Sequence, residues 1–347
     1  MRRFTRMFAT AALVLATVAG TAGWAAGDSQ NAVTGPPPGT AAWRADTARG
    51  RPLPDPVDST PAELARFFAA LDGPTRERLL RTHPLVVGNL DGIPPHLRYR
   101  ANRAAVLATG EARYASLAAP GRRILAFDPR GRGQVAEVFG DLEGAAHVAV
   151  VVPGSDNDAS RHDAPRTPAT GPAGMARALR AAAGADTAVI AWVGYTTPVG
   201  VGVDAAGGRL AEAGAVRLAR FTRGLDAAGA PDPALFCHSY GSVVCGLAAR
   251  HTDATDVVAL GSPGMRADTV ADLGTRARVW AGRGPSDWIA DVPHVRFAGL
   301  GHGADPISAD FGAHPLPTSE VRGHTGYFAP GTRTLAALAR IANGSTR

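Results

Sequence analysis

Short apolar runs alternate with amphipathic stretches from residue 123 to the end of the chain. The runs have the length and the β-branched content of buried strands, and they fall at residues 124–127, 134–139, 147–152, 188–193, 234–237, 257–260, 278–281 and, more weakly, 314–316. Apolar positions recur at helical spacing in residues 174–183, 209–228, 242–251 and 332–342. Strands separated by helices need parallel crossovers, whereas the first two runs are close enough for a hairpin. We therefore predict an α/β fold: a mostly parallel sheet with an antiparallel start, flanked by helices.

The part of the chain before this alternation has a helical pattern. Ser59 or Thr60 can cap a helix that has Pro61 in its first turn, and apolar residues then recur on one face. Further helical stretches follow without an apolar run of strand type. We predict a helical preface over residues 59–120 that packs on a core formed by residues 121–347.

The first residues have the order of an export signal. Three arginines precede a small and apolar run, and further small residues follow it. We predict a signal peptide over residues 1–26, and hence a secreted or cell-envelope protein. The alternative is a membrane anchor, because residues 7–26 reach spanning length, but alanine and threonine make a poor hydrocarbon span. Residues 27–58 are rich in Pro, Gly and Ala and lack apolar periodicity, which predicts a flexible lead-in.

Composition and charge narrow the class of protein. A chain of 347 residues with 45% hydrophobic and 19% charged residues can bury one large core. All 36 basic residues are arginine, and the formal net charge is +6. Three of these arginines lie in the predicted signal, which leaves +3 for the rest, and no basic stripe interleaved with aromatic residues follows. We therefore expect no nucleic-acid partner.

One junction between a predicted strand and a predicted helix carries a serine. The strand at 234–237 leads through His238 and Ser239 into a helix that starts with small residues. This is the sequence context of a nucleophile elbow, which needs small residues two positions before and two after the serine. Gly241 meets the second requirement, and Cys237 replaces the usual glycine at the first. We predict Ser239 as a nucleophile and His238 as a packing or lining residue.

Backbone amides near this serine are candidates for holding an oxyanion. The residue after the nucleophile supplies one donor in such elbows, and here that residue is Tyr240. The loop after the third strand supplies the second, which favours Ser155. The rival serine, Ser262, also ends a strand, but Pro263 after it has no amide hydrogen.

A serine hydroxyl needs a general base, and the base needs a carboxylate that fixes its tautomer. The chain order in α/β-hydrolase folds is serine, acid, histidine. Asp287 follows the strand at 278–281, with Asp291 and Asp305 as competitors further on. His324 directly precedes the last helix, and His302 is the alternative base.

Several motifs together resemble one family. The segments 237–242, 261–265, 302–306 and 323–328, with 87–94 in the preface, are similar to those of an actinobacterial α/β-hydrolase family first catalogued as a domain of unknown function. The similarity covers about residues 61–344. It implies the α/β-hydrolase fold and the triad Ser239, Asp287 and His324, which favours His324 over His302. It implies no substrate.

The remaining candidate chemistry is limited. Cys237 and Cys245 are the only cysteines, and because an exported chain meets an oxidising compartment, we predict a disulfide that braces the elbow. The acidic run at 156–158 lacks the glycine and the distant glutamate of a calcium loop. No metalloprotease motif, phosphate-binding loop or dinucleotide fingerprint occurs in the sequence, so we expect no metal and no cofactor.

These features together predict an exported serine hydrolase. The expected reaction is hydrolysis of a carboxylic ester through an acyl-enzyme, and the expected substrate is a small-molecule or lipid-like ester. Loops at 155–172 and 196–209 should cover the site. We expect membrane contact only if the N-terminal segment is uncleaved. The alternative is a non-catalytic binding module of the same fold at the cell surface.

Overall fold

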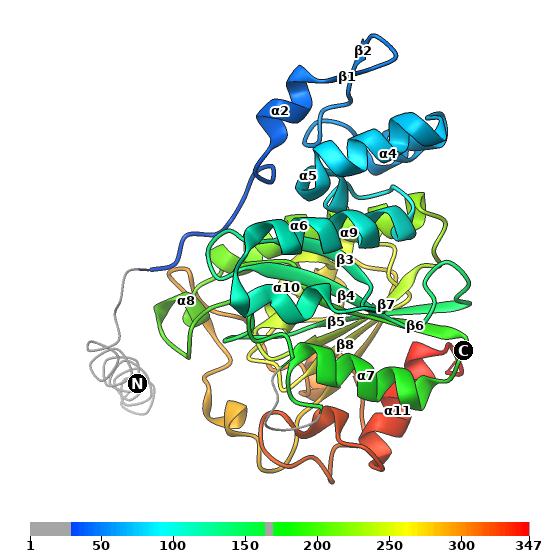
Figure 1. Ribbon diagram of the computed structural model, residues 1–347. Coiled ribbons are helices and arrows are strands. Elements are labelled where there is room, and N and C mark those ends of the chain that lie inside the picture. Colours follow the sequence, from blue (N-terminus) through cyan, green and yellow to red (C-terminus); the bar gives the residue numbers. More distant parts are fainter. Residues whose placement is uncertain (1–28, 164–168, 347) are drawn as a thin grey trace, which may run out of the picture.

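The computed structural model describes residues 29–163 and 169–346 (Figure 1). The predicted export signal at residues 1–26 lies outside the described residues. No helix in the part of the chain that the structure describes is long and apolar enough to cross a membrane.

An eight-stranded sheet forms the centre of the molecule, in the order β12-β9-β8-β7-β5-β6-β4-β3 (Figure 1). β3 pairs antiparallel with β4, and β4 pairs antiparallel with β6, whereas all other neighbours are parallel. The predicted sheet with an antiparallel start is therefore confirmed. Its strands are β3 (Ile124–Asp128), β4 (Gln134–Phe139), β5 (His147–Val152), β6 (Thr187–Val193), β7 (Pro233–His238), β8 (Asp256–Leu260), β9 (Arg278–Gly282) and β12 (His314–Pro315).

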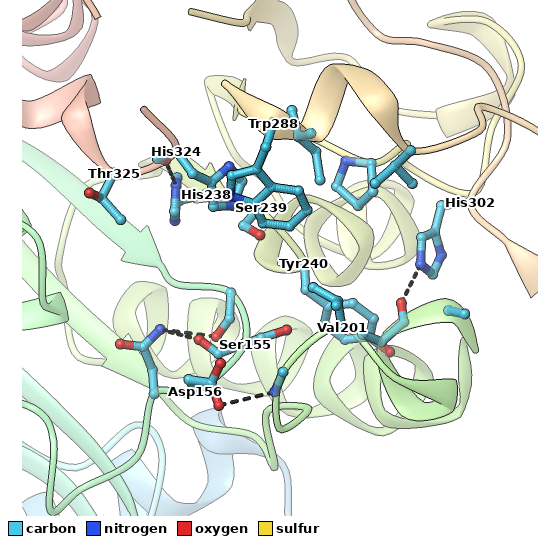
Figure 2. A pocket seen from close by; sticks show the side chains of 18 of the residues that line it. Ser155, Asp156, Val201, His238, Ser239, Tyr240, Trp288, His302, His324 and Thr325 are labelled. Atoms are coloured by element: carbon cyan, nitrogen blue, oxygen red, sulfur yellow. Dashed lines mark hydrogen bonds between the residues drawn. The ribbon is translucent and has the colours of Figure 1, made fainter. Parts of the chain in front are cut away.

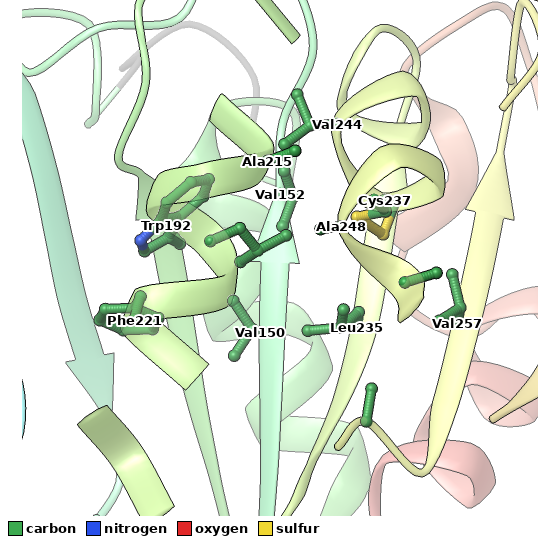
Figure 3. Packing of buried hydrophobic residues seen from close by; sticks show 14 of the residues in the cluster. Val150, Val152, Trp192, Ala215, Phe221, Leu235, Cys237, Val244, Ala248 and Val257 are labelled. Carbon is green, nitrogen blue, oxygen red and sulfur yellow. A yellow bond between two sulfur atoms is a disulfide. The ribbon is translucent and has the colours of Figure 1, made fainter. Parts of the chain in front are cut away.

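Helices cover both faces of this sheet. Side chains alternate between the faces of a strand, and Val150 and Val152 of β5 accordingly pack with helices α9 (Arg209–Ala227) and α10 (Gly241–Ala248) (Figure 3). Val151 of the same strand packs on the other side, with helices α7 (Pro172–Ala183) and α11 (Arg333–Ala342). The short 3-10 helices are η2 (Ala249–His251), η3 (Ala271–Leu273), η4 (Trp288–Asp291), η5 (Ala309–Phe311) and η6 (Gly326–Phe328).

Helices also form most of the region before β3. They are α3 (Pro61–Ala69), α4 (Gly73–Thr82), α5 (Pro84–Gly88), α6 (Pro95–Thr109) and the 3-10 helix η1 (Ala112–Ala118). Thr60 caps α3 through a capping box with Glu63, in which each side chain binds the other residue's backbone amide. These helices share a buried apolar cluster of their own. Tyr114 of η1 joins a second cluster with Phe127 of β3, which links this region to the sheet.

Residues 29–58 differ from the flexible lead-in that their composition predicted. They contain helix α2 (Thr40–Ala45) and a hairpin of β1 (Thr47–Ala48) and β2 (Arg51–Pro52). Trp43 is fully buried, and its indole N–H donates to the carbonyl of Pro54 at 2.8 Å. Gln30 and Val33 also bind distant residues, Asp204 and Thr196, and such contacts leave no periodic signal in the sequence of the segment.

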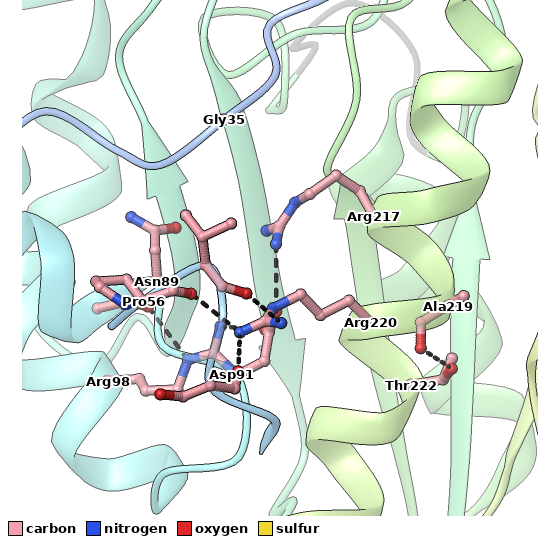
Figure 4. A network of polar contacts seen from close by, with 12 residues as sticks. Gly35, Pro56, Asn89, Asp91, Arg98, Arg217, Ala219, Arg220 and Thr222 are labelled. Atoms are coloured by element: carbon pink, nitrogen blue, oxygen red, sulfur yellow. Dashed lines mark hydrogen bonds and ion pairs between the residues drawn. The ribbon is translucent and has the colours of Figure 1, made fainter. Parts of the chain in front are cut away.

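A buried cluster of charges joins the helical region to α9 (Figure 4). Asp91 is fully buried and accepts a hydrogen bond from Arg98 of α6 at 3.1 Å. Arg217 of α9 binds the other carboxylate oxygen at 3.2 Å, and Arg220 lies 3.7 Å from that same oxygen. The guanidinium group of Arg220 also donates to the carbonyls of Pro56, Val57 and Ser59. Asp91 and its arginine partners thus join three segments that are far apart in the sequence: residues 56–59, residues 91–98 and α9.

We expect the Asp91→Ala variant to lose about 3–5 kcal/mol of unfolding free energy, because Arg98 would remain buried without its counter-charge. Urea unfolding measures this loss. Glu77→Ala is the matched control, since it breaks an exposed ion pair with Arg100 between α4 and α6 and should change stability little. Equal losses in the two variants would contradict a structural role for the buried cluster.

Candidate active site

The turn between β7 and α10 places Ser239 in a strained backbone conformation. Ser239 has a φ of 55°, which residues other than glycine rarely adopt. Its amide donates to the carbonyl of Leu260 in β8 at 2.9 Å. A Cβ atom on Gly241 would collide with the carbonyl oxygen of Val152. The helix can therefore follow the strand this closely only with glycine at 241, which gives the geometry of a nucleophile elbow.

Cys237 and Cys245 form a disulfide beside this turn (Figure 3). The bond joins the end of β7 to α10, with the two Cα atoms 6.4 Å apart, and both residues are fully buried. Cys237 occupies the position that usually holds glycine in an elbow. Its side chain is accommodated because it points into the apolar cluster between the sheet and α10.

A buried carboxylate follows β9, and a histidine from the segment before α11 pairs with it. His324 Nδ1 lies 2.8 Å from Asp287 Oδ1. The same oxygen accepts the amide hydrogen of Ile289 at 3.0 Å, and the Tyr327 hydroxyl donates to Oδ2. Burial by itself raises the pKa of Asp287, but the hydrogen bonds from His324, Tyr327 and Ile289 outweigh it and hold the pKa below its ordinary value. Asp287 is therefore ionised at neutral pH.

Two aromatic rings and a carbonyl contact fix the position of His324. The Trp288 ring centroid lies 4.6 Å from that of His324, and the His238 ring centroid lies 4.8 Å from it. Burial lowers the pKa of His238 to about 4, so this ring is neutral and its Nε2–H donates to the His324 carbonyl at 2.6 Å. His324 Nε2 has no hydrogen-bond partner among the residues that the structure describes, and His324 lines the same cavity as Ser239 (Figure 2).

The backbone at residues 154–155 lies directly beside the serine. A Cβ atom on Gly154 would lie 2.9 Å from Ser239 Oγ and 2.9 Å from the amide nitrogen of Tyr240. The absence of a side chain at Gly154 therefore leaves a space bordered by a hydroxyl group and a backbone amide. Asn157 braces this loop by donating to the carbonyls of Gly154 and Ser155, and Ser155 also lines the cavity (Figure 2).

The competing serine and acids lie in other hydrogen-bonding settings. Ser262 accepts a hydrogen bond from the Ser242 hydroxyl at 2.6 Å and is buried beneath the elbow. Asp305 pairs with Arg283 at 2.7 Å. Asp291 is exposed at the edge of the cavity.

The alternative base, His302, lies on another side of the cavity. Its Nε2 binds the carbonyl of Ala205 at 2.7 Å, and burial lowers its pKa to about 4. Its ring packs edge-on against Tyr240. The structure thus brings Ser239, Asp287 and His324 to one site and places His302 in its wall.

A cavity of about 950 Å³ opens at Ser239. One part of its lining is polar and comes from the loop after β5, including Asp156, Asn157 and Ser160. Most of the remaining lining is apolar; it consists of Met175, Val201, Ala205, Ala206, Pro263, Trp288, Ile289, Val292, Pro293, Val295, Phe297, Ala298 and Leu300. Among the residues with described placement, no group of three His, Cys, Asp or Glu side chains is arranged to hold a metal ion.

Sequence reasoning missed two features of this site. Tyr327, whose hydroxyl binds Asp287, belongs to the motif at 323–328, but no pattern in the sequence pairs it with an acid 40 residues earlier. The second feature consists of the short helix α8 (Val203–Ala206) and the hairpin of β10 (Arg296–Phe297) and β11 (Leu300–Gly301). These elements are too short for periodicity to reveal them.

Comparisons with known proteins agree with this architecture. Residues 128–297, which include Ser239 and Asp287, match the model of a family described as alpha/beta hydrolase. The chain thus has the α/β-hydrolase fold that its motifs implied. His324 lies beyond the matched segment.

Relatives in sequence are uncharacterized. Two proteins from strains of Mycobacterium tuberculosis are each 27% identical to this chain over 382 residues, which cover 84% of this chain and 57% of theirs. This chain therefore spans little more than half the length of those relatives. Their actinobacterial origin and lack of an assigned function agree with the resemblance drawn from the motifs.

Solved structures similar to this chain include three hydrolases. A predicted CIB-like hydrolase from Thermoplasma acidophilum has a TM-score of 0.39 and 12% identity, and the match covers 65% of this chain and 96% of that one. A serine hydrolase without lid from Xanthomonas campestris has a TM-score of 0.36 and 17% identity, with 66% and 95% covered. An esterase from Rhizomucor miehei has a TM-score of 0.40 and 12% identity, with 73% and 99% covered.

We expect the two cysteines to resist alkylation after denaturation without reductant, because they are bonded to each other. Mass spectrometry of the alkylated protein reads this out, and prior reduction is the control that should expose both thiols. Reduction should lower the unfolding free energy by about 2–3 kcal/mol at most, since the closed loop is short. Two alkylated cysteines in the unreduced sample would rule out the bond.

Proposed function

We propose that this protein is an exported serine hydrolase that cleaves carboxylic esters. The observation that carries the proposal is that a serine at positive φ lines the same cavity as His324, whose other side is paired with the buried Asp287. Strain of this kind persists where the surrounding structure imposes it, and it is concentrated at functional sites. Support for export comes from the sequence of residues 1–26 alone.

In the first step of the proposed reaction, His324 Nε2 takes the proton of the Ser239 hydroxyl as its oxygen attacks the ester carbonyl. Asp287 holds the Nδ1–H of His324 and stabilises the imidazolium that forms. Tyr327 is a positioning residue, because its hydroxyl fixes the second oxygen of that carboxylate. His324 then gives its proton to the departing alcohol, which leaves an acyl group on Ser239.

The oxyanion of each tetrahedral intermediate would occupy the space beside Gly154. The amide of Tyr240 borders that space, and an amide of the braced loop at 154–155 is the second donor. In the second step His324 activates a water molecule, which releases the acid and restores Ser239. An apolar cavity of this size suits a small-molecule or lipid-like acyl group.

A fluorophosphonate probe should label Ser239, because the probe reacts with a serine hydroxyl activated by a base. Labelling should vanish in Ser239→Ala with the fold retained, and Ser262→Ala should still label, since that serine is buried beneath the elbow. Peptide mapping by mass spectrometry identifies the modified residue. A wild-type protein that neither labels nor hydrolyses any aryl ester would favour the non-catalytic binding module instead.

Replacing each of the two histidines with alanine, in separate variants, should distinguish their roles. His324→Ala should lower kcat for an aryl ester by about 100- to 10,000-fold, as expected for loss of a general base. His302→Ala should stay within about tenfold of the wild type, because His302 pairs with a carbonyl rather than an acid. Steady-state kinetics measure both, and unfolding curves check that each variant folds. The reverse ranking would move the base to His302.

A further inference from the structure

Exposed apolar side chains are concentrated at the mouth of the cavity. Seven of the eleven large hydrophobic residues that the described chain exposes lie in two segments there, and they are 40% to 82% exposed. We call these seven side chains the apolar rim. They are Val199, Val201, Val203, Trp288, Val295, Phe297 and Leu300.

The two segments of the apolar rim lie against each other. Leu300 forms an isolated antiparallel bridge with Gly207, which directly follows α8. His302 binds the carbonyl of Ala205 within α8, and Arg266 donates to the carbonyl of Gly299 at the hairpin turn. The rim is therefore one surface built by two elements.

The apolar rim extends into the cavity. Val201, Trp288, Val295, Phe297 and Leu300 belong both to the rim and to the cavity lining. Trp288 and Val201 lie on either side of Ser239 in Figure 2. An apolar chain that meets the rim thus contacts side chains that also line the cavity at Ser239.

Residues 30–33 lie beside the α8 segment of the rim. The amide of Gln30 donates to Asp204 of α8 at 2.7 Å, and Arg209 donates to the carbonyl of Gln30. Val33 binds the Thr196 hydroxyl at 2.9 Å.

We propose that the apolar rim docks on a lipid bilayer, so that Ser239 receives its substrate from the lipid phase. The inference that the substrate is a lipid ester rests on the proposed function, whereas the inference of docking does not. Phe297 is 82% exposed beside the hairpin turn at Ala298 and Gly299, a shape suited to insertion into lipid. A second copy of the chain seated on the rim would instead cover the entrance of the cavity.

Charge around the apolar rim is mixed rather than of one sign. Arg296 and Asp291 are both exposed in the same segment, and Asp204 lies next to Arg209 on the α8 side. Electrostatic attraction to anionic lipid would be screened by salt. Docking through burial of apolar surface should therefore occur on zwitterionic phosphatidylcholine vesicles and persist at high salt.

A dye attached at the rim tests docking without catalysis. Because both native cysteines are paired, Phe297→Cys can be labelled selectively in the full chain with an environment-sensitive dye, and Val216→Cys on the exposed face of α9 is the matched control. Phosphatidylcholine vesicles should shift the emission to the blue at 297 and leave it unchanged at 216, in low and high salt. No shift at 297, or equal shifts at both sites, would overturn the proposal. A blue shift at 297 that grows with protein concentration in the absence of vesicles would also overturn it, in favour of a second copy.

Kinetics test the delivery of substrate. Val199 and Val203 belong to the rim but not to the cavity lining, so the double variant Val199→Asp/Val203→Asp should keep wild-type kcat/KM for a short, water-soluble ester. Its rate on a long-chain ester embedded in phosphatidylcholine vesicles should fall about tenfold or more, as expected for losing buried apolar area. Val216→Asp should change neither rate.

Equal effects on the two substrates, or none, would contradict delivery from the lipid. A wild type inactive on both esters would refute the proposed function, while the dye shift would still decide the docking.

Discussion

The close approach of α10 to the sheet at Gly241 is the constraint on which the site depends. A strand can turn into a helix within two residues only if the helix start lies against the neighbouring strand, and a side chain at 241 would collide with Val152 there. This approach forces Ser239 to a φ of 55°. This conformation is held by the hydrogen bond from the Ser239 amide to the Leu260 carbonyl and by the disulfide that joins α10 to β7. The turn thereby places Ser239 at the cavity rather than within the sheet.

Two buried carboxylates show how the same physics serves stability and function. Asp91 and Asp287 are both removed from water, and each is surrounded by hydrogen-bond donors that compensate its desolvation. The donors to Asp91 are guanidinium groups from α6 and α9, so the cluster is a fixed joint between parts of the fold. One donor to Asp287 is the imidazole of His324, whose other nitrogen has no partner among the described residues. That nitrogen is the atom that the proposed mechanism uses as the general base.

The elbow is also linked to the wall of the cavity. The Tyr240 hydroxyl donates to the carbonyl of Gly207 at 2.9 Å and accepts the amide hydrogen of Ala211 at 3.2 Å. Gly207 in turn forms the bridge with Leu300. The residue whose amide borders the oxyanion space thus also anchors the point where the two segments of the apolar rim meet. The Tyr240 side chain therefore links the turn at Ser239 to the wall at the entrance of the cavity.

The sequence by itself determined the sheet, its flanking helices and the elbow, because these features are written in local periodicity. Apolar runs as short and as rich in valine as 147–152 favour buried strands, and a serine between such a run and a small-residue helix has the sequence context of an elbow. The order serine, acid, histidine along the chain also restricted the candidate acid to the region after β9. The order in residues 29–58 was not predicted because Gln30 and Val33 are held by distant partners, Asp204 and Thr196, which local sequence does not encode.

The motifs favoured His324 over His302, but only the tertiary structure showed that His324 contacts Asp287. His302 and His324 both follow Asp287 in the chain, and their local sequences are equally rich in glycine. The segment before α11 folds back over 37 residues to bring His324 to Asp287, while the hairpin of β10 and β11 directs His302 to α8. Tyr327 and the apolar rim arise in the same way, from loops whose partners are chosen by packing. The periodicity of a sequence predicts which face of a helix or strand is buried. Which loops contact each other depends instead on where the sheet places the ends of those loops.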